Sequence, residues 1–172
     1  MDKIKKVREI LSEKDLDSVL VMSAHNRRYL SDFTGSAGSV IVTQDEAILV
    51  SDFRYKAQGQ EQAKNLDFVL QKGGHLPFVI ELLESKGIKK LGFEGHLTTY
   101  NTYAELDKSF ELTPLTAEIE KIRMVKSDDE VAVIQKACDI ADETYEHILT
   151  FVKAGMTELD VKNELERKMR EL

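Results

Sequence analysis

Two hydrophobic patterns alternate along the first 113 residues of the chain. Short continuous apolar runs, several of them β-branched, are typical of strands that are buried on both faces. Between these runs, apolar residues recur every three or four positions, as in helices that bury one side. This alternation predicts an α/β fold, with a three-layer αβα domain in which helices cover both faces of a sheet. The predicted strands are 19–22, 39–43, 47–50, 68–70, 90–94 and 110–113, and the predicted helices are 4–11, 26–33 (short or irregular), 55–64, 76–86 and 99–106.

One pair of predicted strands is joined too closely to be parallel. Only the polar residues 44–46 separate 39–43 from 47–50. A connection of this length favours an antiparallel hairpin, because a parallel crossover needs a dozen or more residues. The six predicted strands therefore form a mixed sheet.

After Pro114 the pattern becomes purely helical. The charged stretch 118–123 marks the transition, and we place a domain boundary after it. Residues 1–122 are predicted to form the sheet domain, and residues 123–172 a linker followed by the first helices of a second, truncated domain.

Two helices are predicted in this second part. Ser127 with Glu130 forms a capping box, and Thr157 caps the helix that follows. The first helix extends about 42 Å at 1.5 Å per residue and ends at Gly155. We expect the two helices either to pack on the sheet domain or to begin a larger domain, because they cannot bury both apolar stripes between themselves. The stripes comprise residues 131, 134, 138, 141, 145, 148 and 152, and residues 161, 165, 169 and 172.

The charge of the chain excludes several function classes. Its net charge is −7 and its Lys and Arg residues are scattered, whereas nucleic-acid binders carry a basic face. An acidic protein also gains little from anionic membranes, and no segment is apolar for long enough to span a bilayer. Cys138 is the only cysteine, and the first residues open an amphipathic pattern rather than a signal sequence. We therefore expect a cytoplasmic protein with no nucleic-acid or membrane partner.

The chain shows no strong catalytic or metal motif. Its four histidines, at 25, 75, 96 and 147, include no pair four residues apart that could grip a metal from one helix face. His147 and Glu143 lie opposite the apolar stripe and are predicted to be a solvated pair. Cys138 lies on the stripe and is predicted to be a buried apolar residue rather than a nucleophile. We predict no catalytic residue and no metal ligand here.

The glycine-rich segment 35–38 has two interpretations. Backbone amides near glycines can bind phosphate. However, no Gly-Lys-Ser/Thr sequence follows, and the next element is a strand without a helix dipole. The segment is therefore predicted to be a tight turn in which glycine permits a positive φ.

The sequence 52–55, Asp-Phe-Arg-Tyr, directly follows a predicted strand. Strand ends in α/β sheets are where ligands collect, and the Arg54 guanidinium could bind a carboxylate through two hydrogen bonds. The alternative is an internal pair of Arg54 with Asp52 or Asp32, with Tyr55 filling the space between helix and sheet.

Five segments together resemble a known family. They are NRRYLSDFTGSAG at 26–38, DFRY at 52–55, LGFE at 91–94, IRMVKS at 122–127 with Glu130, and GMTE at 155–158. Their order is similar to that of the amino-terminal domain of Xaa-Pro peptidases (aminopeptidase P, prolidase and the related creatinase), followed by the entry to the catalytic "pita-bread" domain. The match runs along essentially all 172 residues.

The resemblance implies a metal-dependent parent enzyme. In this family two divalent metals, commonly manganese, are held by two aspartates, a histidine and two glutamates, and a bridging water attacks the Xaa-Pro amide. No counterpart of these ligands occurs before Leu172, so these residues alone are expected to bind no cofactor and to be inactive. The family also implies a homodimer in which this domain shapes the partner's pocket for proline-containing peptides. Arg54, Tyr55 and Phe33 are the residues to which the resemblance gives that role.

Two other functions remain open at the sequence level. A non-catalytic peptide- or protein-binding module is one, since the same architecture looks to be reused without metals in a histone chaperone. A free-standing small-molecule-binding domain is the other, although no cofactor fingerprint supports it. The sequence does not separate a dipeptidase from an aminopeptidase P.

Overall fold

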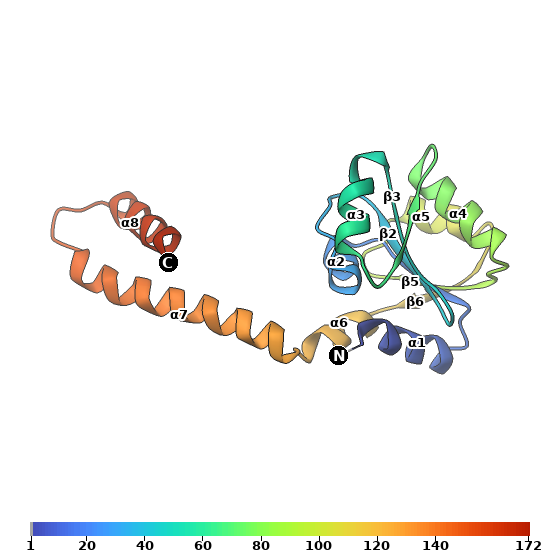
Figure 1. Cartoon of the computed structure of the whole chain (residues 1–172), viewed down its shortest axis with the longest axis horizontal. Coiled ribbons are helices and arrows are strands. Elements are labelled where there is room, and N and C mark those ends of the chain that lie inside the picture. Colours follow the sequence, from blue (N-terminus) through green and yellow to red (C-terminus); the bar gives the residue numbers. More distant parts are fainter. Residues whose placement is uncertain (1) are drawn as a thin grey trace. The chain divides into compact units, whose positions relative to one another are not determined.

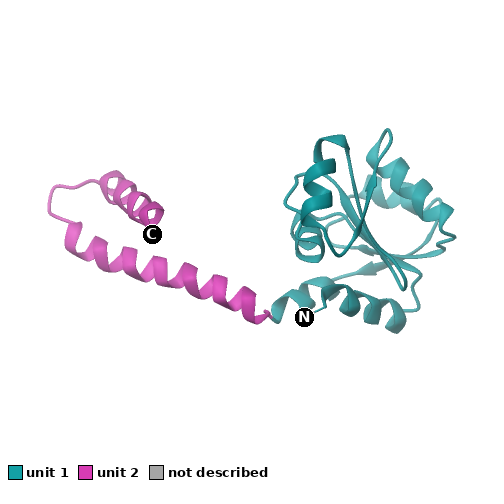
Figure 2. Ribbon diagram, in the orientation of Figure 1, with its two compact units in different colours: residues 1–125 teal, residues 126–172 magenta. Residues whose placement is uncertain are grey.

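The computed structural model describes residues 2–172, which divide into two compact units. The first comprises residues 1–125 and the second residues 126–172 (Figure 2). The division falls after Val125, whereas the sequence placed it after Ile122. No helix among the described residues is long and apolar enough to cross a membrane.

The strands of residues 2–125 form one six-stranded sheet in the order β4-β3-β2-β1-β5-β6 (Figure 1). β2 runs antiparallel to both β1 and β3, and the remaining neighbours are parallel. The predicted hairpin and the mixed sheet are therefore confirmed. The strands are β1 (Ser18–Val21), β2 (Ser39–Thr43), β3 (Ala47–Ser51), β4 (Asp67–Leu70), β5 (Lys90–Glu94) and β6 (Glu111–Leu115).

Helices cover both faces of the sheet and make the predicted three layers. On one face, Val7, Leu30 and Ile119 belong to the same buried cluster as Val40 and Val42 of β2. The other face packs against α4 and α5, and the intervening β2 residue Ile41 points that way. Successive side chains of β2 point to opposite faces of the sheet, so the strand contributes to the apolar cluster on each face. The helical elements of this unit are α1 (Lys3–Glu13), α2 (Ala24–Ser31), η1 (Phe53–Tyr55), α3 (Lys56–Gln62), α4 (His75–Ser85), α5 (Tyr100–Leu106) and α6 (Glu118–Met124).

Pro114 lies inside β6 rather than after it. The strand is at the edge of the sheet, where the missing N–H of proline removes no ladder bond on the open side. The strand therefore continues to Leu115. In α5, Tyr100 is exposed and Leu106 supplies the buried contact of the helix.

The second unit consists of α7 (Asp128–Phe151) and α8 (Glu158–Glu171). Both start at a capping box, of Ser127 with Glu130 and of Thr157 with Asp160, which confirms these caps. α7 ends before Gly155, which lies in the connecting turn with φ of +94°.

The side chains of α7 correct two predictions. Cys138 is exposed, because most of the apolar stripe of α7 has no cover within residues 126–172. His147 and Glu143 do not form a pair. His147 Nε2 lies 2.6 Å from Glu164 Oε1, and Lys168 donates to Glu143 at 2.8 Å. A helical wheel treats a helix alone and misses these partners on α8.

The stripe of α8 is also not buried. Val161 and Leu165 are half-buried, while Met169 and Leu172 are exposed. Within residues 126–172, Thr144 and Ile148 of α7 are the buried residues of the two helices. Most of the apolar surface of this unit therefore remains available for packing.

Candidate functional site

One edge of the sheet gathers the polar residues that the fold buries. β1, β3, β4 and β5 run parallel to one another and end at this edge. The segments that follow them, together with the loop 34–38 before β2, lie there. Carboxyl ends of parallel strands are where α/β proteins place ligand-binding groups.

A buried arginine holds the loop 34–38 in place. The Arg27 side chain comes from α2, and the residue is 4% exposed. Its Nη1 donates to the carbonyl of Gly38 at 2.9 Å and to that of Met22 at 3.3 Å, and its Nη2 donates to the carbonyl of Gly35 at 2.8 Å. Burial lowers the pKa of Arg27, while the negative charge of Glu94 opposes that effect. The guanidinium thus serves as a fixed internal anchor and does not face solvent.

Two glycines let the loop approach its neighbours closely. A Cβ on Gly35 would lie 2.1 Å from Cζ of Phe33, so the ring leaves no space for a side chain. Gly38 has φ of +139°, and a Cβ there would lie 2.6 Å from the carbonyl oxygen of Val50. The chain bends at residues 36–37, the predicted positive φ is present at Gly38, and both glycines leave no space for a side chain.

Phe33 lies in the core beneath this loop. It is 1% exposed and belongs to the cluster formed with α1, α2 and α6. A side chain without accessible surface cannot line an open substrate pocket, so the direct contact expected of Phe33 is not available in this structure. Its ring instead supports Tyr55, edge-on, with the ring centroids 5.5 Å apart.

Tyr55 connects the loop to the segment after β3. Its hydroxyl lies 2.7 Å from Ser36 Oγ, and this hydrogen bond lowers the pKa of Tyr55. One end of the half-buried ring packs against the core, as the internal alternative predicted, while the hydroxyl remains at the surface.

Arg54 pairs internally with Asp52. Its Nε donates to Asp52 Oδ1 at 3.0 Å and its Nη2 to Asp52 Oδ2 at 2.7 Å. The guanidinium also lies over the Tyr55 ring, 5.4 Å from its centroid. The hydrogen bonds raise the pKa of Arg54 and lower that of Asp52. Asp32, the other partner considered, lies instead 3.5 Å from Lys3 Nζ.

The Arg54 side chain is nevertheless 60% exposed. The neighbouring Phe53 is 78% exposed. A cation and a large apolar ring thus stand together at the surface of this edge, in a form suited to a ligand that carries an anionic and an apolar part.

His75, at the start of α4, is a second basic group at this edge. Its Nδ1 is hydrogen-bonded to Gln71 Oε1, and its Nε2 is buried without a partner among residues 2–172. Burial, together with the positive charge of Arg27, lowers the pKa of His75, and the nearby Asp52 carboxylate opposes this. Burial therefore favours the neutral form of the ring.

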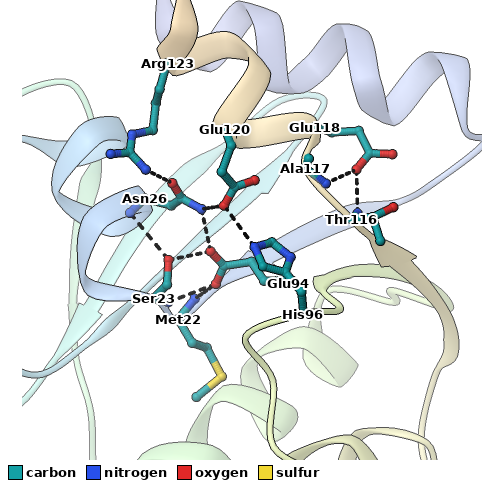
Figure 3. Close-up of polar contacts among 10 residues, drawn as sticks. All are labelled: Met22, Ser23, Asn26, Glu94, His96, Thr116, Ala117, Glu118, Glu120 and Arg123. Carbon is teal, nitrogen blue, oxygen red and sulfur yellow. Dashed lines mark hydrogen bonds and ion pairs between the residues drawn. The ribbon is translucent and has the colours of Figure 1, made fainter.

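The end of β5 carries a buried carboxylate (Figure 3). Glu94 is 3% exposed and sits at the amino end of α2. Its Oε2 accepts hydrogen bonds from the backbone N–H groups of Met22 and Ser23, and its Oε1 accepts from the Ser23 hydroxyl and the Asn26 amide. The carboxylate thus satisfies two backbone N–H groups that precede α2 and two side chains at its start.

Asn26 links this carboxylate to α6. Its Nδ2 also donates to Glu120 Oε1 at 2.6 Å, and its Oδ1 accepts from Arg123 Nη1 at 3.0 Å (Figure 3). His96 Nε2 lies 3.5 Å from the same Glu120 oxygen. The centre of the edge is therefore filled by the protein's own polar groups.

The structure places Arg54 and Tyr55 beside each other, and Tyr55 beside Phe33 and Ser36 of the loop. The sequence interpretation missed Arg27, His75 and Glu94. The sequence did contain a signal for Glu94. It is an acidic residue at the end of a predicted buried strand, and Asp52 occupies a similar position after another strand. We find no such local signal for Arg27, because nothing in the sequence distinguishes it from the exposed Arg28.

No metal centre is present in the part of the chain that the structure describes. Residues 2–172 contain no group of three or more His, Cys, Asp or Glu side chains placed to hold a metal ion. The pair of divalent metals implied by the resemblance does not fit the residues present here.

The family described as "Creatinase/Prolidase N-terminal domain" matches residues 3–125. The chain belongs to this family. The matched range includes the sheet, the loop 34–38 and the Arg54 segment. It ends where the first unit ends.

Several relatives that contain this creatinase/prolidase N-terminal domain are named as peptidases. The "Uncharacterized peptidase YqhT" of Bacillus subtilis is 39% identical over 98% of this chain and 48% of its own length. The structure of an Xaa-Pro dipeptidase from Bacillus anthracis is 37% identical, with a TM-score of 0.92, over 99% of this chain and 49% of that one. The N-terminal domain of the cytoplasmic peptidase PepQ from Mycobacterium tuberculosis is 28% identical, with a TM-score of 0.64, over 69% of this chain and 96% of that domain. The chain spans about half the length of the full-length relatives it matches.

Proposed function

We propose that this creatinase/prolidase N-terminal domain serves a longer, metal-dependent Xaa-Pro dipeptidase or aminopeptidase P. The observation that carries the proposal is the alignment of nearly the whole chain with about half of an Xaa-Pro dipeptidase. Residues outside these 172 would then bind two divalent metal ions, for which we propose manganese, and would catalyse the hydrolysis. The residues described here would contribute recognition and assembly.

The recognition role falls to Arg54 and Tyr55 in a homodimer. In this proposal the domain covers part of the partner subunit's pocket, and Arg54 meets the free carboxylate of an Xaa-Pro dipeptide. Its exposure and its planar, always charged fork support this, because a guanidinium matches a carboxylate through two hydrogen bonds. Tyr55 carries the guanidinium on its ring face.

The test compares two substrates of the full-length protein that contains this sequence. An Xaa-Pro dipeptide has the carboxylate, whereas the corresponding Xaa-Pro amide lacks it. We expect Arg54→Ala to raise KM for the dipeptide about tenfold and to change KM for the amide much less. Arg28→Ala is the matched control, since Arg28 is an exposed arginine on the neighbouring α2.

Equal kinetics of Arg54→Ala and the wild type on both substrates would refute the recognition role. Absence of any Xaa-Pro hydrolysis by the full-length protein with manganese would refute the enzymatic proposal and favour a peptide-binding module. Sedimentation of the full-length protein as a monomer would refute the dimer.

We also propose a cytoplasmic location and no nucleic-acid partner. The net charge of −7 supports the second point. Fractionation of cells that produce the protein tests the first, and a secreted or membrane-bound pool as its main form would contradict it.

A further inference from the structure

The Asp52–Arg54 pair leaves one side of the guanidinium unused. A guanidinium offers two edges that can each bind a carboxylate through two hydrogen bonds, one formed by Nε with one Nη and the other by the two Nη atoms. Asp52 occupies the first edge, with contacts from Nε and Nη2. The edge formed by both Nη atoms remains, on a side chain that is 60% exposed.

Asp52 is itself fixed, unlike most surface carboxylates. Its side chain is 15% exposed, and its Oδ1 also accepts the backbone N–H of Arg54 at 3.0 Å, which caps η1. The preceding Ser51 donates through its hydroxyl to the carbonyl of Ala37 at 2.7 Å. The carboxylate is therefore held by η1, and the residue before it is attached to the loop 34–38.

Tyr55 restrains the guanidinium from a third direction. The ring lies beneath Arg54, contacts Phe33 edge-on and is tied to Ser36 through its hydroxyl. A chain of contacts thus runs from the buried Phe33 to the exposed arginine. An arginine side chain normally loses conformational entropy when it binds a ligand. Because these contacts already restrict Arg54, much of that entropy cost is avoided on binding.

We propose that Asp52 is a positioning residue that holds Arg54 with its second edge directed at the carboxylate of the substrate. The inference rests on the proposed recognition role of Arg54. It adds that the carboxylate of Asp52, despite its negative charge, strengthens the binding of a second carboxylate by fixing the plane of the guanidinium.

Simple electrostatics makes the opposite prediction. Removing the charge of Asp52 leaves a more positive surface, which would attract an anionic substrate more strongly. If positioning dominates, removing the charge of Asp52 weakens substrate binding, because the Arg54 side chain becomes free to adopt several rotamers. Asp52→Asn separates the two, since the amide oxygen still can cap η1 while the charge is lost.

The experiment measures KM and kcat of the full-length protein with the Xaa-Pro dipeptide and its amide. We expect Asp52→Asn to raise KM for the dipeptide about fivefold, with little effect on the amide or on kcat. The double variant with Arg54→Ala should match Arg54→Ala alone, because Asp52 acts through Arg54. Asp45→Asn, the same charge change at an exposed turn, is the control.

The outcomes are distinguishable. A lowered or unchanged KM for the dipeptide in Asp52→Asn, with a raised KM in Arg54→Ala, overturns the role of Asp52 and leaves that of Arg54. Equal losses on dipeptide and amide also overturn it, since they indicate general damage. If Arg54→Ala has no effect on the discrimination between the two substrates, both roles fail.

A second measurement needs no activity. In the 172-residue chain, the Nε–H group of Arg54 should have a high NMR order parameter that falls in Asp52→Asn. An order parameter that is the same in both proteins would show that Asp52 does not restrain the guanidinium, and would overturn the inference.

Discussion

At the scale of single residues, two buried charges organise the edge of the sheet. Arg27 satisfies carbonyl groups of the loop 34–38, and Glu94 satisfies donors at the start of α2. A buried charge is tolerated only when hydrogen bonds replace its lost hydration. Both side chains are held by internal hydrogen bonds, whereas the Arg54 side chain is 60% exposed.

The carboxylate of Glu94 should contribute strongly to stability. Glu94→Gln replaces an acceptor oxygen with an amide that opposes the donors from Met22, Ser23 or Asn26. We expect a loss of about 3 kcal/mol in the free energy of unfolding. Urea denaturation measures it, with the exposed Glu81→Gln as control. A loss as small as that of the control would contradict this assignment.

His75 should make the stability sensitive to mild acid. Its pKa in the folded protein lies below the ordinary 6.5 of the unfolded chain, so the unfolded state takes up the proton first. Stability contributed by the neutral ring is complete above about pH 6.5 and is lost as the pH falls through the interval down to the folded pKa.

The comparison of His75→Gln with the wild type tests this. The variant should lose less stability between about pH 7 and about pH 5, measured by thermal denaturation. His25→Gln, at an exposed position on α2, should keep the wild-type slope. Parallel pH profiles for His75→Gln and the wild type would rule out the buried neutral histidine.

At the scale of elements, α6 is held to the sheet unit by apolar and polar contacts together. Ile119 and Ile122 are buried in the cluster shared with α1 and α2. Glu118 lies 2.8 Å from Lys14 and accepts the N–H groups of Thr116 and Ala117. A seven-residue helix has little stability alone, so these contacts determine that it forms.

Glu118 should stabilise the folded protein by an amount that decreases in acid. Although burial opposes its charge, the hydrogen bonds of Lys14 and the backbone N–H groups lower the pKa of Glu118 to about 2. The stabilisation is present above the ordinary value of 4.5 and is lost as the pH falls towards about 2. Glu118→Gln should therefore lower stability at neutral pH and flatten its fall between about pH 5 and about pH 3.

Chemical denaturation at a series of pH values measures this effect. Glu9→Gln, at an exposed position of α1, provides the control. If Glu118→Gln retains the full acid sensitivity of the wild type, the hydrogen-bonded carboxylate is not its source.

At the scale of the whole molecule, the two units differ in how much they bury. Residues 2–125 contain two apolar clusters, one on each face of the sheet. In residues 126–172, many large apolar side chains are exposed, among them Val133, Tyr145 and Leu149. Burial of apolar surface is the main source of stability, so the first unit should be much the more stable.

Hydrogen exchange should show this difference. We expect backbone amides of β1 and β2 to exchange only through global unfolding of the first unit, whereas those of α7 and α8 exchange through local opening of far lower free energy. Mass spectrometry of peptides from the exchanged 172-residue chain measures both. Equal protection of the two units would show that they unfold together.

Local patterns in the sequence predicted much of the fold. The alternation of periods predicted the sheet, its hairpin and its covering helices, and the Ser127 and Thr157 boxes gave the starts of α7 and α8. Side-chain partners were less accessible. The pairing of Arg54 with Asp52 is one of the alternatives that the sequence predicts, since the two residues are only two positions apart. The partners of His147 and Glu143 on α8 are 17 and 25 positions away and were not predicted.

What the sequence determined by itself is therefore what depends on neighbours along the chain: periodicity, caps and turns, since their hydrogen bonds close within a few residues. Only the tertiary structure decided which charges are buried and what satisfies them. Glu94 meets the amide of Met22 across 72 positions of sequence. Such a contact requires β1 and β5 to lie side by side in one register, and that follows from the packing of the whole sheet rather than from any local pattern.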